Sequence, residues 1–203
     1  TDLFPYIGSE LKTDQPALVE MGYFSIITGG KGILIDGYDT LSYPDRQNRI
    51  LYVKQLFKEL SNNNNELADA VLSEDITSQF EANPRFKLDY KWSYSERCQA
   101  NIEYLTEVSK GIDFIAKRKD GKIYIIAVNP YDAIKDAEFS SPLLNGKTKV
   151  KVMFEEREIP ISQDSTGKIY FTDRFEKTFN LVKSDGSSSS VTNGIERHVY
   201  IIE

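Results

Sequence analysis

The spacing of apolar residues changes near residue 75 and divides the chain into two parts. Before that point, the run from Ala17 to Ile27 is apolar almost all round and predicts a largely buried helix. The aliphatic stretch from Ile33 to Asp36 predicts a short strand covered on both faces. A second helix is predicted by apolar positions that recur every three or four residues: Ile50, Val53, Phe57 and Leu60. Helix, buried strand and helix in this order indicate an α/β segment.

After Asp75 the apolar positions recur every two residues, which is typical of half-buried strands. The strongest signal is a hairpin in which residues 112–117 and 122–128 flank the turn Asp120-Gly121. The stretch from Ser184 to Gly194, with its four consecutive serines, is expected to be a loop. Further strands are expected over residues 86–92, 133–139, 149–154, 168–172, 177–182 and 197–202.

These patterns predict an α+β chain in two parts. Residues 1–75 form the α/β segment, residues 76–103 a connecting segment with a first strand, and residues 104–203 an antiparallel β-sandwich. The sandwich fold alone does not indicate an activity.

Composition narrows the function classes. The net charge of -6 argues against a nucleic-acid partner, because phosphate binding needs clustered Lys and Arg. No apolar run approaches the ~20 residues of a membrane span. With Cys98 and His198 as the only residues of their kinds, a Zn site of the usual nitrogen and sulfur ligands is excluded. We expect no metal and no cofactor.

Two stretches resemble the C-terminal portion of a (β/α)8-barrel glycoside hydrolase with a trailing β-sandwich domain. The first runs from Ile26 to Tyr38 and is similar to the last barrel helix, its Gly-rich turn and the eighth strand. The second combines Asp173-Arg174-Phe175-Glu176 with His198-Val199-Tyr200 and looks like the closing strands of the sandwich. The strand from Ile123 to Asn129, followed by Pro130, is similar to that domain's second strand.

The resemblance implies a carbohydrate-active enzyme that hydrolyses glycosidic bonds of a poly- or oligosaccharide outside the cytoplasm. It also implies that the chain begins near the end of barrel strand seven, with Asp2 and Tyr6 on the following loop. The rest of the barrel, or a partner chain that completes it, would lie outside the sequence. Glycoside hydrolysis usually needs two carboxylates about 5 to 9.5 Å apart, and these catalytic residues cannot be identified here.

The candidate substrate-binding residues follow the two expected barrel strands: Asp2, Tyr6, Asp36, Tyr38 and Asp39. Asp36 ends a buried strand, where barrel enzymes present functional side chains. Tyr6 and Tyr38 could stack on sugar rings. The alternative for Asp36 is a structural role, in which it bonds the neighbouring backbone of an Asp-Gly turn.

Other side chains have both functional and structural interpretations. Tyr90, Trp92 and Tyr94 share one face of a strand and could form a sugar-binding platform, although core packing is favoured. His198 is expected to be a partly exposed strand residue rather than a general base, and Glu155 to Glu158 a solvated turn. The alternative to a hydrolase is a non-catalytic carbohydrate-binding or structural β-sandwich module.

Overall fold

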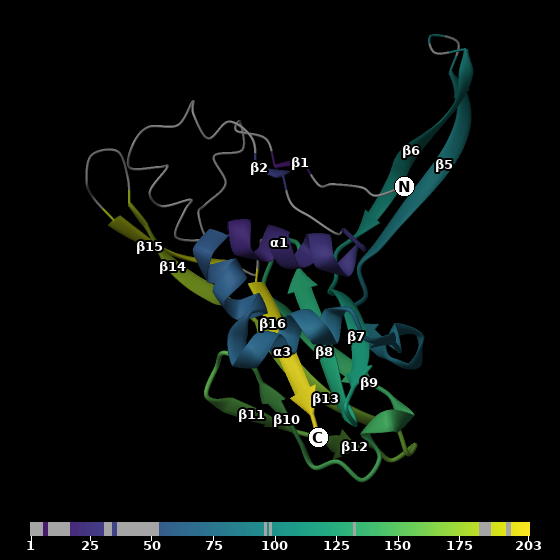
Figure 1. The fold of residues 1–203 in the computed structure, drawn as a ribbon. Coiled ribbons are helices and arrows are strands. Elements are labelled where there is room, and N and C mark those ends of the chain that lie inside the picture. The colour runs from purple at the N-terminus through teal and green to yellow at the C-terminus, as the bar shows by residue number, and fades with distance from the viewer. Residues whose placement is uncertain are drawn as a thin grey trace.

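The computed structural model describes residues 6–7, 17–30, 34–35, 53–95, 97, 99–131, 133–182, 188–193 and 196–203. Within them, antiparallel sheets dominate and helices are few, which confirms the β-rich character predicted for the chain (Figure 1). The barrel-like part of the predicted fold class stays a prediction.

Two antiparallel sheets form the sandwich. The larger has the strand order β11-β10-β16-β8-β7-β3 and the smaller the order β12-β13-β9-β4. The strands of the larger sheet are β3 (Glu74–Asp75), β7 (Asp113–Lys119), β8 (Lys122–Asn129), β10 (Lys149–Val152), β11 (Arg157–Pro160) and β16 (Glu196–Ile202). Those of the smaller sheet are β4 (Glu81–Asn83), β9 (Lys135–Ser140), β12 (Ser162–Gln163) and β13 (Ile169–Phe175). Strands β3 and β4 lie upstream of residue 104, where we expected the sandwich to begin.

The predicted hairpin is confirmed. Strands β7 and β8 pair from Asp113↔Val128 to Lys119↔Lys122, and Asp120 and Gly121 both have positive φ, of 51° and 79°. Two successive positive φ values are those of a type I′ turn, whose twist matches that of the strands it joins. The Asp-Gly pair supplies this geometry, because Gly has no Cβ to clash and Asp tolerates the left-handed region.

Between the sheets lies a core of aromatic and aliphatic side chains. Phe139 of β9 is at its centre and contacts Phe171 at a ring distance of 5.1 Å and Tyr200 at 5.4 Å. Phe114 of β7 meets the other side of Phe139 edge-on at 5.7 Å. Offset and edge-to-face contacts of this kind add to the stabilisation from burial.

A layer of helices covers the outer face of the larger sheet (Figure 1). The layer contains α1 (Ala17–Ile27), as predicted, a helical stretch over residues 53–60 and α3 (Asn62–Val71). The alternation along β8 shows the arrangement: Ile125 belongs to the sandwich core, whereas Ile126 packs with Tyr23, Leu56 and other residues of the helices. Because both faces of β8 are covered, its sequence is apolar without interruption from Ile123 to Val128.

Strands β1 (Tyr6–Ile7) and β2 (Leu34–Ile35) pair in parallel, with Tyr6 opposite Leu34 and Ile7 opposite Ile35. Helix α1 lies between them in the sequence, which makes a β-α-β unit. The strand expected from Ile33 to Asp36 is thus present over Leu34–Ile35.

Two further hairpins stand apart from the sandwich sheets. Strands β5 (Lys87–Ser95) and β6 (Ala100–Ser109) form a ribbon that projects from the body (Figure 1). Strand β14 (Lys177–Val182) pairs with β15 (Ser188–Asn193). The loop predicted from Ser184 to Gly194 is therefore wrong over residues 188–193. Despite its serines, this segment forms strand β15, which pairs with β14.

Candidate functional site

The predicted substrate-binding residues fall in the N-terminal part of the chain. Tyr6 lies within strand β1, opposite Leu34, and not on the loop after the strand as we expected. The strand extends to Ile7, so the loop begins later than the resemblance implied. Asp2, Asp36, Tyr38 and Asp39 lie outside the described residues.

The densest group of polar side chains lies around Asp173, at the buried face of β13. Its carboxylate accepts two hydrogen bonds from the Arg157 guanidinium, at 2.7 Å on Oδ1 and 3.0 Å on Oδ2. The Tyr200 hydroxyl donates to Oδ2 at 2.8 Å, and His198 Nδ1 lies 2.7 Å from the same oxygen. The other ring nitrogen of His198 faces carboxylates too, at 3.3 Å from Glu196 and 3.7 Å from Glu155.

These contacts fix the charges in the cluster. Burial raises the pKa of Asp173, but hydrogen bonds from His198, Arg157 and Tyr200 outweigh it and hold that pKa far below its usual range. For His198, burial lowers the pKa, whereas the hydrogen bonds to Asp173 and Glu196 raise it, and the net shift is upward. The cluster is therefore a buried carboxylate that Arg157, Tyr200 and His198 all contact.

His198 is closed to substrate. Its side chain is 2% exposed, and its ring stacks on Phe175 at 4.4 Å. The prediction of a partly exposed residue was wrong, because β16 lies inside the larger sheet between β10 and β8. Glu155 and Arg157, expected in a solvated turn, belong to the same network, with Arg157 Nε donating to Glu155 at 2.5 Å. The geometry is that of a structural cluster rather than a general base.

A second buried ion pair joins the sandwich to the helical layer. Arg197 of β16 donates to both oxygens of Glu59, at 3.0 Å from Nε and 2.5 Å from Nη2. The Tyr23 hydroxyl of α1 donates to Glu59 at 2.7 Å, and Gln55 donates to it at 3.0 Å. Burial, followed by the charge of Glu59, raises the pKa of Tyr23 well above its ordinary value. No local pattern predicts this pair, since each residue lies in an ordinary helix or strand pattern.

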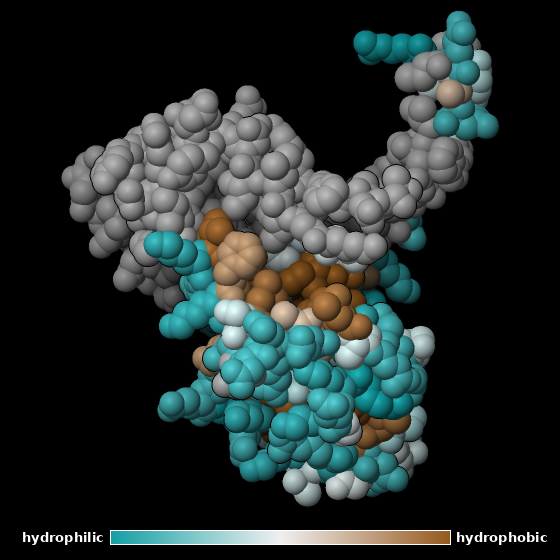
Figure 2. Space-filling view, viewed as in Figure 1, coloured by the Kyte–Doolittle hydropathy of each residue, from teal (hydrophilic) through white to brown (hydrophobic). Residues whose placement is uncertain are grey.

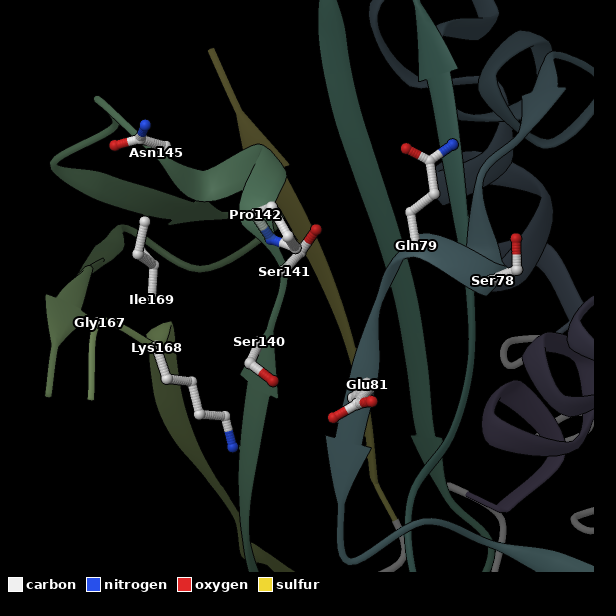
Figure 3. Close-up of a pocket in the computed structure, with 10 residues that line it drawn as sticks. All are labelled: Ser78, Gln79, Glu81, Ser140, Ser141, Pro142, Asn145, Gly167, Lys168 and Ile169. Carbon is white, nitrogen blue, oxygen red and sulfur yellow. The ribbon is translucent and has the colours of Figure 1, made fainter.

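An open groove lies at one end of the smaller sheet, with a volume of about 520 Å³ (Figure 3). Ser78, Gln79 and Glu81 lie on one side of it, and Ser140 and Lys168 are among the residues on the other (Figure 3). Sequence analysis did not single out any of these residues. They are common polar types in short turns, and only the fold brings them together.

The aromatic strip predicted on β5 is partly described. Tyr94 lies on the projecting ribbon and is 61% exposed, so it is not in the sandwich core. Among the residues that the structure describes, no group of His, Cys, Asp and Glu is arranged to hold a metal ion. None of the helices in those parts of the chain is long and apolar enough to cross a membrane.

Comparison of the chain with protein-family models, with curated proteins and with solved structures found no match.

Proposed function

We propose that the chain is the C-terminal part of a carbohydrate-active hydrolase, in which the sandwich braces the last units of a (β/α)8 barrel. The observation that carries the proposal is the β1-α1-β2 unit, whose parallel strands are followed by helices and then by the sandwich. Parallel strands joined by a helix are the repeating unit of such barrels. The carboxyl ends of β1 and β2 lie at the same end of the pair, which is where barrel enzymes carry their active sites.

The open edges of the β1–β2 pair support a larger sheet. In the described part of the chain, β1 and β2 pair only with each other. Parallel sheets are normally covered on both faces and extend over several strands. In the proposed enzyme, the neighbouring barrel strands occupy these edges and supply the catalytic carboxylates.

The surface of the helical layer supports the same arrangement. Phe57 is 65% exposed and Leu72 is 86% exposed, and both belong to the helical segments or their ends. Figure 2 shows apolar residues gathered around α1 on this face, whereas hydrophilic residues cover α3 and most of the sandwich. Barrel helices pack against neighbouring helices on both sides, so apolar side chains outside the sheet interface are expected there.

The bracing role follows from the contact between the two layers. The outer face of the larger sheet contributes Tyr124, Ile126, Val128 and Val199 to a core shared with the helices. The Arg197–Glu59 pair crosses the same contact. A free-standing binding module would instead leave this face of its sheet polar. These contacts favour the bracing role over the alternative of an independent module.

Hydrolysis by the full-length native gene product tests the proposal. Release of reducing sugar from a panel of neutral and acidic polysaccharides is the readout, with Asp36→Asn as the test variant and the exposed Asp69→Asn as its control. We expect wild type and Asp69→Asn to hydrolyse at least one polymer, and Asp36→Asn to lose tenfold or more of kcat/KM. Absence of hydrolysis across the panel would contradict the proposed function. Full activity of Asp36→Asn would contradict the role of Asp36.

A further inference from the structure

The groove at the end of the smaller sheet has walls from several separate segments. One wall comes from the 3-10 turn η2 (Thr77–Gln79) and the start of β4. The other comes from the end of β9, the turn η3 (Pro142–Leu144) and the residues just before β13. Its volume of about 520 Å³ lies within the range of small-ligand sites. Because the walls are anchored in sheet strands, the groove is part of the rigid sandwich.

Several polar side chains in this groove form no hydrogen bond in the described part of the chain. These are the side chains of Ser78, Gln79, Glu81 and Asn145. The backbone nitrogens of Gln79 and Asn145 do form hydrogen bonds, which close their turns. Ser140 is a largely buried residue that also lines the groove (Figure 3). Hydroxyl, amide and carboxylate groups are thus presented together to solvent, ready to bond a ligand.

The charge of the groove argues against an anionic ligand. Lys168 donates to Glu138 at 2.6 Å and also interacts with the charges of Glu81 and Asp164, so its single positive charge faces three carboxylates. An anion such as phosphate would need an excess of positive charge. Pro142 and Ile169 add an apolar part to this set of otherwise polar lining residues.

We propose that this groove is a non-catalytic binding site for a neutral saccharide. Side-chain amides and carboxylates can bond two adjacent hydroxyl groups at once, and serine hydroxyls both donate and accept. The groove offers all three within one surface. Among the described residues that line it, Glu81 is the only carboxylate, so the groove would bind sugar without the acid and base that hydrolysis requires.

The choice of a saccharide rests on the proposed function, whereas the location and polarity of the site do not. The groove lies at the end of the sandwich near β12, and the β1–β2 pair lies beyond the helical layer (Figure 1). Binding here would therefore hold a polymer on the enzyme at a distance from the proposed active site.

Chemical-shift mapping of the ¹⁵N-labelled full chain tests the site. The probes are neutral tetrasaccharides of β-1,4-glucose, β-1,4-xylose, β-1,4-mannose and α-1,4-glucose, with inorganic phosphate as the charged comparison. We expect at least one tetrasaccharide to shift the amide signals of residues 78–81, 140–145 and 167–169, and phosphate to shift none of them. The double variant Gln79→Ala/Asn145→Ala should weaken binding tenfold or more, and the control Asn62→Ala, an exposed amide in α3, should leave it unchanged.

Three results would overturn the proposal: no shift with any tetrasaccharide, shifts confined to the β5–β6 ribbon, or equal binding by the double variant. The outcome is separable from that of the hydrolysis assay. Hydrolysis by the native product without shifts at the groove removes this site alone. Shifts at the groove without hydrolysis leave the site standing and contradict the catalytic part of the proposed function.

Discussion

Arg197 and His198 are neighbours in strand β16, yet their side chains enter different layers of the molecule. Arg197 reaches the helical layer and pairs with Glu59, whereas His198 faces the smaller sheet and contacts Asp173. The alternation of side chains along a strand produces this arrangement. One dipeptide thus connects all three layers through buried, charged contacts.

Removal of one member of the Arg197–Glu59 pair should be strongly destabilising. Both side chains are 9% exposed, so Arg197→Met leaves the Glu59 carboxylate buried without its cation. Loss of one partner of a buried pair costs about 3 to 5 kcal/mol. We expect a fall of this size in the free energy of unfolding, measured by urea denaturation.

The exposed pair Lys122–Glu203 provides the control for this experiment, with side chains 39% and 68% exposed. Lys122→Met should leave the free energy of unfolding close to that of the wild type, as is usual for surface pairs. The double variant Glu59→Leu/Arg197→Met should recover most of the lost stability, since no unpaired charge remains. If Arg197→Met costs no more than Lys122→Met, the ion pair does not link the layers.

His198 should titrate above its ordinary pKa of 6.5, because its hydrogen bonds to Asp173 and Glu196 outweigh the effect of burial. It is the single histidine of the chain, so its imidazole proton signal can be followed by NMR without assignment. Asp173→Asn removes the nearest carboxylate, and the midpoint should then move downward. A wild-type midpoint at or below 6.5 would contradict the upward shift of the His198 pKa.

The same shift makes stability depend on pH. Since the folded pKa of His198 is raised, its contribution is fully present below 6.5, the unfolded value, and is lost as the pH rises through the folded pKa. The free energy of unfolding should therefore decline from neutral to alkaline pH, and less steeply in His198→Gln. Asp173 makes stability depend on pH in the acidic range instead. Because the folded pKa of Asp173 is lowered, its contribution to stability is present above pH 3.8, the unfolded pKa. This contribution is lost as the pH falls through the folded pKa.

Local sequence patterns predicted the elements better than they predicted their partners. The Asp120-Gly121 hairpin and helix α1 were predictable because their signals lie within a few residues of each other. By contrast, Arg197 and Glu59 are 138 residues apart, and no local pattern connects them. The burial of His198 was missed for the same reason, since it depends on β10 and β8 flanking β16. The unbroken apolar run of β8 did contain a signal for two covered faces, which predicts a third layer.

That third layer leads to a prediction about Ile125 and Ile126, which are both 0% exposed on opposite faces of β8. Replacement of either by Ala removes a buried side chain and leaves a cavity, at a cost of about 2 to 5 kcal/mol. We expect the two variants to lose similar amounts of unfolding free energy in urea. The exposed Ile134→Ala, at 40% exposure, should change it by about 0.5 kcal/mol or less. If Ile126→Ala resembles Ile134→Ala instead, the helices do not form one folding unit with the sandwich.

Gly111 holds the base of the β5–β6 ribbon against the sandwich, and its replacement by Ala should disrupt that junction. A Cβ there would lie 2.5 Å from the carbonyl carbon of Arg85 and 2.7 Å from the backbone nitrogen of Phe86, neither of which can move freely. The adjacent backbone bonds, Phe86 N to Ile112 O at 3.0 Å and Ile112 N to Pro84 O at 2.9 Å, would have to break or shift. We expect Gly111→Ala to lower the free energy of unfolding by about 3 kcal/mol or more, in the range of strong backbone clashes and overpacking.

Gly121→Ala is the matched control for Gly111→Ala. At Gly121 nothing lies within 4 Å of the added Cβ, and only the positive φ of 79° opposes the substitution. A left-handed backbone costs a residue with a Cβ about 1 to 2 kcal/mol. Gly111→Ala should therefore be the more damaging of the two, and amide exchange of the backbone bonds at Phe86 and Ile112 should accelerate in it alone. Equal losses in both variants would mean that the close approach to Arg85 is relieved at little cost, and that the ribbon is not held at this point.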